Sequence, residues 1–456
     1  MVQRSHDGAG PPGAARGQAL LSRRRLLQGG LAGAGALALG GLLGGCGPAA
    51  GPGGSTVRYW SLFNGGDGAL MERMLAEIAE QAPHLRVEPT VLAWGAPYYT
   101  KLAMASVGGR APETGIMHLS RLAGYAPGGL LDPFDLGLLA EFGVGAEHFL
   151  PELWGRASHD GRHYAIPLDT HPLIVFYDTG TADRAGLLTS EGALRAFESP
   201  EDFVEASREL AEASGDNGVA FGHVNDDAQG WRVFFSLYSQ TGAAMELPAG
   251  GPAVFDPDAA LRVFTLLAEV FDGETSSNRL DYQTALAGFS SGRSGLLFCG
   301  EWELPYLRDA VPDLGVAPFP TLFEQPASYA DSHSFVLPRQ SDPDPERVRA
   351  AHEFVALMVR ASLTWAEAGH VPAYQPVVES AAYRGLGPQT DYAASAENPA
   401  LEPAAWFAGA GSDFQSDMGS VVQTALMGAG PEAAVDQLDR ALSNWVARTN
   451  PTEESA

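Results

Sequence analysis

The sequence predicts an α/β fold divided into two lobes. The chain has 456 residues, which is too long for one ordinary hydrophobic core and long enough for two domains of roughly 100–200 residues each. Hydrophobic residues make up 45% of the chain and charged residues 18%, as in folded globular proteins. Strand, helix and strand patterns follow one another from residue 56 onward, and this order indicates βαβ units with a mainly parallel sheet.

Residues 1–45 have the pattern of a signal peptide. Three arginines, Arg23 to Arg25, precede a glycine-rich apolar run that ends at Cys46. A basic front, an apolar middle and small residues at the cut are typical of export signals, and the twin arginine indicates the Tat pathway. Leu43-Gly44-Gly45-Cys46 resembles the lipobox of bacterial lipoproteins. The sequence therefore predicts an acylated Cys46 that anchors the chain to the outer face of the cytoplasmic membrane, followed by a flexible tether over residues 46–55.

The first lobe is expected to begin directly after the tether. Residues 56–60 form the first predicted strand, and a helix follows to about Gln81, with Asp67 near its start as a plausible cap. Residues 86–91 form the second strand. Further predicted elements of this lobe are a helix at 98–107, a strand at 115–118 and a helix that starts near Ser120.

A crossing between lobes is predicted where Pro167 and Pro172 interrupt a strand pattern over 164–177, because proline does not fit a central strand. The second lobe then follows as a mainly helical region with a few short strands. Its predicted helices are 203–213, 231–240 and 259–271. Predicted strands cover 295–298, 315–319 and 334–337, and the chain is expected to be largely helical from Glu346 onward.

Charge and cysteine content exclude several classes of function. The net charge of −27 argues against a nucleic-acid partner, whose phosphates would be repelled. No window after residue 46 is apolar for the roughly 20 residues that a membrane helix needs. Cys299 is the one cysteine after Cys46, so no disulfide is expected. Its apolar neighbours predict a buried thiol.

Two catalytic or metal-binding patterns are rejected on local structure. Gly288 to Gly292 matches G-x-S-x-G, but a helix pattern precedes Ser290 and a strand follows it, which reverses the order of a nucleophile elbow. His159 and His163 have the i, i+4 spacing of some zinc sites, but Asp160-Gly161 between them marks a turn. We therefore expect no catalytic residue, no metal and no cofactor.

Aromatic and polar residues gather at the predicted turns between strands and helices. A sugar-binding site needs both aromatic and polar residues, because the C–H faces of a sugar pack on aromatic rings and its hydroxyls need fixed hydrogen-bond donors and acceptors. In open α/β sheets such turns line the ligand crevice. The candidate ligand-binding residues are Trp60, Asn64, Asp67, Trp94, Tyr98, Ser120, Asp169, His171, Asn225, Asp226, Trp231, Glu301, Trp302, Ser332, His333 and Tyr374.

Several segments together resemble the extracellular solute-binding proteins of carbohydrate ABC importers, the maltose-binding-protein-like family. These segments are 60–68, 94–102, 161–171, 289–302 and 365–374. The resemblance implies a periplasmic-binding-protein-like type II fold, with two α/β lobes joined by a hinge that the chain crosses three times. Lobe 1 is then expected over 56–168 and 332–372, and lobe 2 over 173–330 and 376–456. The crossings are expected near 169–172, 330–334 and 371–376.

This family resemblance also implies the function and its partners. A monomeric receptor would bind a sugar or oligosaccharide between its lobes and deliver it to the permease subunits of an ABC importer, without catalysis. The sequence leaves three alternatives open: an exported glycoside-active enzyme with two carboxylates, a solute sensor for a signalling kinase, and a peptide, polyamine or glycerol-phosphate as the ligand.

Overall fold

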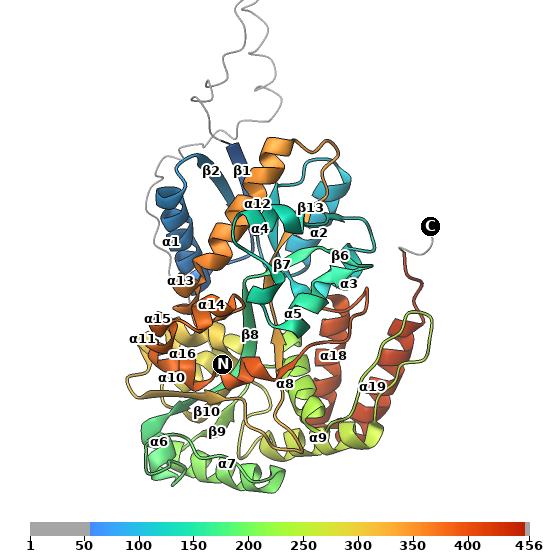
Figure 1. Cartoon of the computed structure of the whole chain (residues 1–456). Helices are drawn as coiled ribbons and strands as arrows, with labels where there is room; N and C mark the ends of the chain where they lie inside the picture. Colours follow the sequence, from blue (N-terminus) through green and yellow to red (C-terminus); the bar gives the residue numbers. More distant parts are fainter. Residues whose placement is uncertain (1–54, 452–456) are drawn as a thin grey trace, which may run out of the picture. The chain divides into compact units, whose positions relative to one another are not determined.

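Two β-sheets organise the described part of the chain. The structure is a computed structural model, and it describes residues 55–451. The expected signal peptide, Cys46 and the tether before Ser55 lie outside the described residues. We call the sheet that contains β1, with its helices, lobe 1, and the sheet that contains β8, with its helices, lobe 2 (Figure 1). The two lobes have separate hydrophobic cores.

Lobe 1 is built on a sheet with the order β2-β1-β3-β13-β4, and β7 also pairs with β13. Its strands are β1 (Ser55–Ser61), β2 (Leu85–Val91), β3 (Thr114–His118), β4 (Leu131–Asp132), β7 (Ala165–Pro167) and β13 (His333–Pro338). Its helices are α1 (Gly65–Gln81), α2 (Ala96–Val107), η1 (Leu119–Arg121), α3 (Leu122–Tyr125), α4 (Leu136–Glu141), η2 (Ala146–His148), α5 (Pro151–Arg156), α12 (Pro345–Arg360) and α13 (Ser362–Ala366). Helix α1 turns Met71, Met74 and Ile78 toward the core.

Lobe 2 has the strand order β15-β12-β8-β10-β9, and β11 and β14 also pair with β8. Its strands are β8 (Asp169–Asp178), β9 (Asn217–Ala220), β10 (Ser294–Gly300), β11 (Leu314–Pro318), β12 (Ser328–Asp331), β14 (Val371–Pro372) and β15 (Pro399–Ala400). Its main helices are α6 (Thr179–Arg184), α7 (Pro200–Ser214), α8 (Asp227–Gln240), α9 (Pro257–Val270), α10 (Tyr282–Ser290), η3 (Glu301–Glu303), α11 (Leu304–Ala310), α18 (Asp413–Thr424), η4 (Ala425–Ala429) and α19 (Pro431–Val446). Four short helices lie between β14 and β15, namely α14 (Gln375–Val378), α15 (Ala381–Arg384), α16 (Gly387–Asp391) and α17 (Ala394–Glu397).

Three chain segments meet at the start of β8. Asp331 of β12 is the partner of His171, and Pro372 of β14 is the partner of Asp169. The chain runs directly from β7 into β8 and from β12 into β13, so it passes from one sheet to the other at both places (Figure 1). Residues that are far apart in the sequence are thus held side by side by backbone hydrogen bonds.

The observed elements agree with most of the sequence prediction. Strand β1, helix α1 and strand β2 have the predicted order, and β1 pairs in parallel with β2 and β3. A hairpin of β5 (Ser158–His159) and β6 (Arg162–His163) turns at Asp160-Gly161, as predicted. Cys299 is buried, also as predicted. Among residues 55–451, no helix combines the length and the apolar character that crossing a membrane requires.

Two local expectations differ from the structure. The lobe 1 sheet is less parallel than predicted, because β13 runs antiparallel to β3, β4 and β7. This strand enters from lobe 2 instead of from a helix of lobe 1, which the local pattern does not reveal. Asp67 is not the cap of α1: Asn64 occupies the N-cap position, and the Asp67 carboxylate contacts His370 instead.

Candidate functional site

Five buried side chains converge at the start of β8, where β12 and β14 pair with it, and we call them the hinge cluster. Strand β8 supplies Asp169 and His171, and His333 is the first residue of β13. His370 immediately precedes β14, and Glu301 begins η3 directly after β10. None of the five residues is more than 5% exposed. Each lies at a strand end or strand start, which is why four separate segments can place five polar groups in one small volume.

The Asp169 carboxylate is the centre of the hinge cluster. Its Oδ1 is 3.0 Å from His171 Nδ1, and its Oδ2 is 2.8 Å from His333 Nδ1. The Trp365 indole also donates to Oδ2, at 2.7 Å. Burial alone raises the pKa of the Asp169 carboxyl, but His333 and His171 outweigh it and hold that pKa well below its usual value. Asp169 is therefore ionised and fixed in place.

His370 connects carboxylates of the two lobes. Its Nε2 is 3.1 Å from Oδ1 of Asp67 in α1, and its Nδ1 is 2.9 Å from Oε1 of Glu301 in lobe 2. Burial lowers the pKa of His370, but Asp67 and Glu301 outweigh this effect and leave the pKa well above its usual value. Burial raises the pKa of Glu301 to about 7. A charged imidazole thus bridges the lobes in the observed arrangement.

An aromatic and cationic group lies beside the hinge cluster in lobe 2. The Trp302 ring is 6.1 Å from the His171 ring, and its indole donates to Tyr282 Oη at 2.8 Å. The Arg232 guanidinium lies 5.0 Å from the Trp302 ring centroid. Arg232 is buried, and Nη1 donates to Gln229 Oε1 at 3.2 Å. Among the described side chains, the Nε of Arg232 has no hydrogen-bond acceptor.

The lobes touch through hydrogen bonds beside a cavity. Ser120 of lobe 1 donates to Asp331 Oδ2 at 2.5 Å and accepts from the Ala410 amide at 3.0 Å. Arg156 of lobe 1 donates to the Glu402 carbonyl. A cavity of about 370 Å³ lies at this contact, lined by Ser120, Arg156, His159 and other residues of lobe 1 and by Leu247, Pro248, Trp406 and other residues of lobe 2. The buried Trp406 indole N–H has no acceptor among the described residues.

The match to a known family decides what kind of protein this is. Residues 81–403 match the model of the family described as bacterial extracellular solute-binding protein. The chain belongs to this family. Comparison of this solute-binding protein with curated proteins gives no match.

Solved structures share the fold of this solute-binding protein. The GacH receptor of Streptomyces glaucescens GLA.O, solved unliganded and with acarbose, is 18% identical with a TM-score of 0.71 over 86% of this chain and 99% of that one. UgpB from Mycobacterium tuberculosis, in complex with glycerophosphocholine, is 17% identical with a TM-score of 0.72 over 86% and 98%. MalE from Bdellovibrio bacteriovorus, bound to maltotriose, is 18% identical with a TM-score of 0.66 over 86% and 100%. At these identities the likeness establishes the two-lobed fold.

The structure of the solute-binding protein brings only part of the predicted site together. Asp169, His171, Glu301 and His333 form the hinge cluster, and Ser332 lies beside them, directly before His333. Asp67 reaches this cluster through His370. Trp302 lies next to His171, and Ser120 lines the cavity between the lobes.

The remaining predicted residues lie elsewhere. Tyr98 and Tyr374 are buried in the lobe 1 core and Trp231 in the lobe 2 core. Trp60 lines a groove along α2, and Trp94 is 43% exposed. Asn64 is exposed at the start of α1, Asn225 has a positive φ of 57°, and Asp226 caps α8. We call the hinge cluster, its neighbours and the side chains that line the cavity between the lobes the interlobe layer. Three of the six predicted aromatic residues are thus part of a core, and only Trp302 is part of the interlobe layer.

Sequence reasoning missed several residues of this layer, among them Arg156, Arg232, Asp331, His370 and Trp406. Arg232 lies inside the predicted helix 231–240, and Asp331 lies inside the crossing predicted at 330–334. His370 belongs to the stretch 365–374 that carries the family resemblance, and a histidine between Gly and Val-Pro could have been noticed there. Nothing in the sequence near Trp406 indicates that it faces lobe 1.

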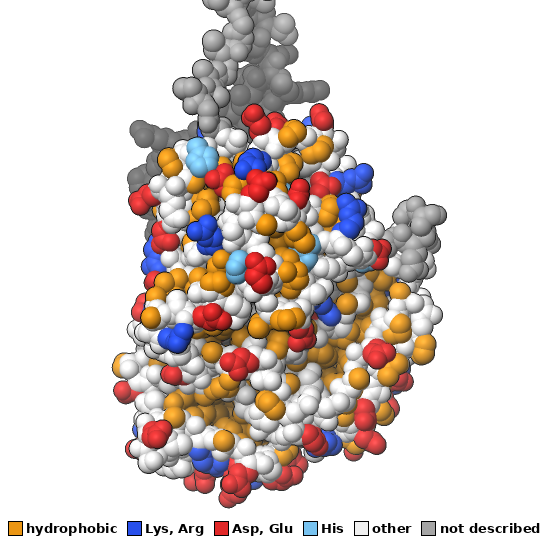
Figure 2. Space-filling view, in the orientation of Figure 1, with side chains coloured by type: hydrophobic (Ala, Val, Ile, Leu, Met, Phe, Trp, Pro, Cys, Tyr) orange, Lys and Arg blue, Asp and Glu red, His pale blue; other side chains and the backbone are white. Residues whose placement is uncertain are grey.

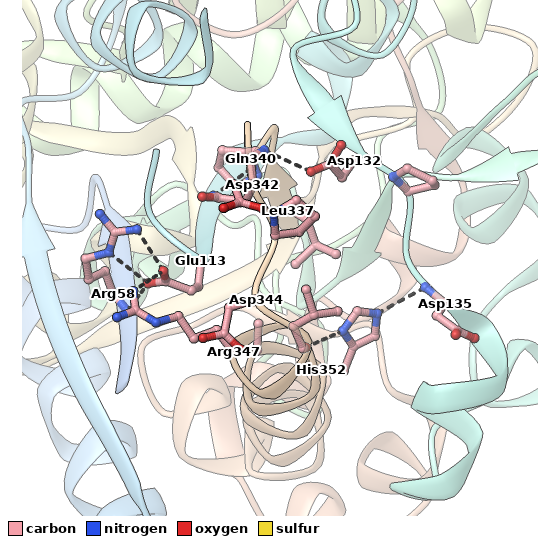
Figure 3. Close-up of a pocket in the computed structure, with 15 residues that line it drawn as sticks. Arg58, Glu113, Asp132, Asp135, Leu337, Gln340, Asp342, Asp344, Arg347 and His352 are labelled. Atoms are coloured by element: carbon pink, nitrogen blue, oxygen red, sulfur yellow. Dashed lines mark hydrogen bonds and ion pairs between the residues drawn. The ribbon is translucent and has the colours of Figure 1, made fainter. Parts of the chain in front are cut away.

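A second pocket, of about 460 Å³, lies wholly within lobe 1 (Figure 3). Its charged groups satisfy one another: Glu113 accepts from Arg58 at 2.7 Å and from Arg347 at 3.2 Å. His352 accepts from the Asp135 amide at 3.0 Å. Because these polar groups are paired and no residue of lobe 2 contributes, closure of the lobes cannot act on this pocket, and the interlobe layer is the better candidate site.

Proposed function

We propose that this solute-binding protein is the receptor of an ABC importer, which captures a sugar or oligosaccharide between its lobes and delivers it to the permease subunits. The cavity that both lobes line carries this proposal. It combines the Trp406 indole with Ser120, Arg156 and His159, and this mixture of an aromatic ring with fixed hydrogen-bonding groups suits a polyol. Sugar ligands of GacH and MalE point in the same direction.

The receptor is proposed to work as an exported, lipid-anchored monomer without catalytic activity. Cys46 in its lipobox-like setting would carry the acyl chains. Ligand bound to one lobe would recruit the other, so contacts such as Ser120 to Asp331 would strengthen on binding. Acidic side chains spread over the face shown in Figure 2 and gather near α7, which would keep the receptor soluble and repel anionic surfaces.

A second ligand class, a phosphodiester of glycerol, is favoured by Arg232. The buried Nε of this guanidinium has no hydrogen-bond acceptor among the described side chains, and an anionic group on the ligand would supply one. UgpB, which shares the fold, was solved with glycerophosphocholine. The sugar proposal and this alternative differ in whether Arg232 is needed for binding.

A thermal-shift screen tests the function directly. Mono- and oligosaccharides, with glycerophosphocholine as a separate arm, are added to the full chain, and a tight ligand raises the melting temperature by mass action. If the protein is a sugar receptor, we expect at least one saccharide to bind without being hydrolysed or otherwise changed. Turnover of the hit would favour the enzyme alternative. Binding of glycerophosphocholine alone, with loss of that binding in Arg232→Met, would favour the phosphodiester.

Variants locate the site once a ligand is found. We expect Trp406→Ala and Arg156→Gln, which change the cavity, to weaken binding by tenfold or more, about 1.4 kcal/mol. Asp169→Asn and Trp302→Ala test the hinge cluster and its neighbour. Trp94→Ala is the matched control, because this exposed indole lies outside the cavity. Wild-type affinity in all four site variants would show that the ligand does not bind in the interlobe layer.

A further inference from the structure

Three imidazole nitrogens in the hinge cluster surround one carboxylate at the spacing of metal ligands. Asp169, His171, His333 and His370 each offer a ligand atom, and the four atoms lie within 4.8 Å of one another. The distances from an Asp169 carboxylate oxygen to Nδ1 are 3.0 Å for His171, 2.8 Å for His333 and 3.6 Å for His370. Two ligands of a tetrahedral zinc ion, each about 2.1 Å from the metal, lie about 3.4 Å apart, which is close to these separations. The rings of His171 and His333 are stacked, with centroids 4.1 Å apart, and would have to turn for both lone pairs to meet one ion.

The polar groups around these four residues also point to a cation. The carboxylates of Asp67, Asp169 and Glu301 have only imidazoles as ion-pair partners among the described residues. Both Glu301 oxygens and His370 Nδ1 are buried without a well-aligned hydrogen bond. Leaving such groups unsatisfied in a protein interior is costly. A divalent ion at the centre would compensate the negative charge of these carboxylates and take the lone pair of His370 Nδ1.

Neighbouring residues already orient two of the ligands. Asp67 Oδ1 is 3.1 Å from His370 Nε2, so a neutral His370 would carry its proton at Nε2 and turn its Nδ1 lone pair toward the cluster. The Trp365 indole donates to Asp169 Oδ2 and stacks on the His370 ring at 4.5 Å. Such hydrogen bonds to ligand residues are a regular part of metal sites, because they fix the tautomer and the ring orientation.

We propose that the hinge cluster binds one transition-metal ion of the Zn²⁺ or Co²⁺ type, through the Nδ1 atoms of His171, His333 and His370 and a carboxylate oxygen of Asp169. Three nitrogens and one oxygen suit these ions, whereas Mg²⁺ and Ca²⁺ prefer oxygen ligands. Binding requires the Nδ1 proton of a neutral imidazole to move to Nε2, and it releases a proton only from an imidazole that is charged. The metal joins all three segments that cross between the sheets, so it stabilises the hinge. The site is separate from the cavity proposed for the solute.

Metal binding is measured on the full chain without a polyhistidine tag. After removal of metal with a chelator and addition of Zn²⁺ or Co²⁺, elemental analysis is expected to find about one ion per chain. The Co²⁺ form should show the visible absorption of a four-coordinate site, and Zn²⁺ should raise the melting temperature by several degrees while Mg²⁺ and Ca²⁺ do not. These readouts do not depend on any sugar, so their failure leaves the proposed function untouched.

Variants assign the binding to the hinge cluster. His333→Asn and His370→Gln are expected to weaken metal binding at least about tenfold, and Trp365→Phe, which changes an orienting residue, by about tenfold. His159→Asn, in the exposed hairpin, is the control. If His333→Asn does not fold, the proposal is still tested by the Co²⁺ spectrum of the wild type and by metal binding of His370→Gln. Wild-type chain that retains no Zn²⁺ or Co²⁺, or binding that persists in both ligand variants, overturns the proposal.

Discussion

Buried histidines of this protein fall into two kinds. His370 has carboxylate neighbours that keep its pKa high, whereas burial lowers the pKa of His223 to about 4 and that of His163 to about 4. His223 packs against Phe221 in lobe 2, with ring centroids 5.2 Å apart. A histidine of this second kind is neutral in the folded protein and must stay neutral for the fold to be stable.

The low pKa of His223 predicts a pH-dependent stability. Between its usual pKa of 6.5 and the folded value of about 4, the unfolded chain binds the proton more readily than the folded one, so stability falls as the pH drops through this window. The wild type should lose unfolding free energy as the pH falls through this window, and His223→Leu should reduce that loss by on the order of 2–3 kcal/mol. Denaturant unfolding of variant and wild type across the window measures it. The control is His159→Leu in the exposed hairpin, and equal slopes for His223→Leu and wild type would contradict the prediction.

At the scale of elements, close approaches of backbone explain why some glycines cannot be replaced. A Cβ added to Gly218 in β9 would lie 2.0 Å from the Ser207 carbonyl oxygen of α7. Helix α7 therefore packs directly on the strand. Gly288 in α10 is the opposite case, because a Cβ there would meet no atom within 4 Å.

Replacing these two glycines should have opposite effects. Gly218→Ala must push α7 from β9 and is expected to destabilise the protein by about 3 kcal/mol. Gly288→Ala, at an open position of a helix, should stabilise it by about 0.5–1 kcal/mol. Thermal unfolding of the two variants beside wild type is the measurement. Similar stability of the two variants would mean that α7 and β9 are packed more loosely than described.

Elements with a regular local pattern could be predicted from the sequence, but most contacts of the site could not. Strand β1 and helix α1 follow from period-two and helical patterns over a few residues. The contact between Asp67 and His370 joins residues 303 positions apart, and local patterns contain no information about such a pair. Asp169, His171 and His333 were predicted as polar residues at strand ends, but their mutual contacts depend on how β12 and β14 pair with β8.

For the whole molecule, part of the contact between the lobes is made by backbone atoms. Gly124 of α3 in lobe 1 faces the Trp406 carbonyl of lobe 2, and a Cβ there would lie 2.5 Å from that oxygen. Gly409 of lobe 2 faces the Ser120 backbone in the same way, and a Cβ added to Gly409 would lie 2.7 Å from the Ser120 carbonyl group. These contacts exist only when the lobes are together, so they can be perturbed without disturbing the core of either lobe.

Gly124→Ala should oppose closure and leave the lobes folded. Alanine suits helix α3, but its methyl group would collide with the Trp406 carbonyl when the lobes meet. We expect a larger radius of gyration by small-angle scattering and at least about tenfold weaker binding of the best saccharide from the screen. Gly288→Ala is the control, because no atom lies within 4 Å of its added Cβ and Gly288 does not line the cavity. A Gly124→Ala chain as compact as wild type, with unchanged affinity, would contradict this role of the contact.

The place of β13 in the lobe 1 sheet has a consequence for biosynthesis. This strand lies between β3 and β4, yet its residues, His333–Pro338, follow most of lobe 2 in the chain. A growing polypeptide can therefore not finish its first sheet until this late segment has left the ribosome. Until then the edge of β3 that β13 will cover stays open to incorrect pairing. Newly made chains are thus expected to depend on chaperones for longer than a protein whose domains are continuous in sequence.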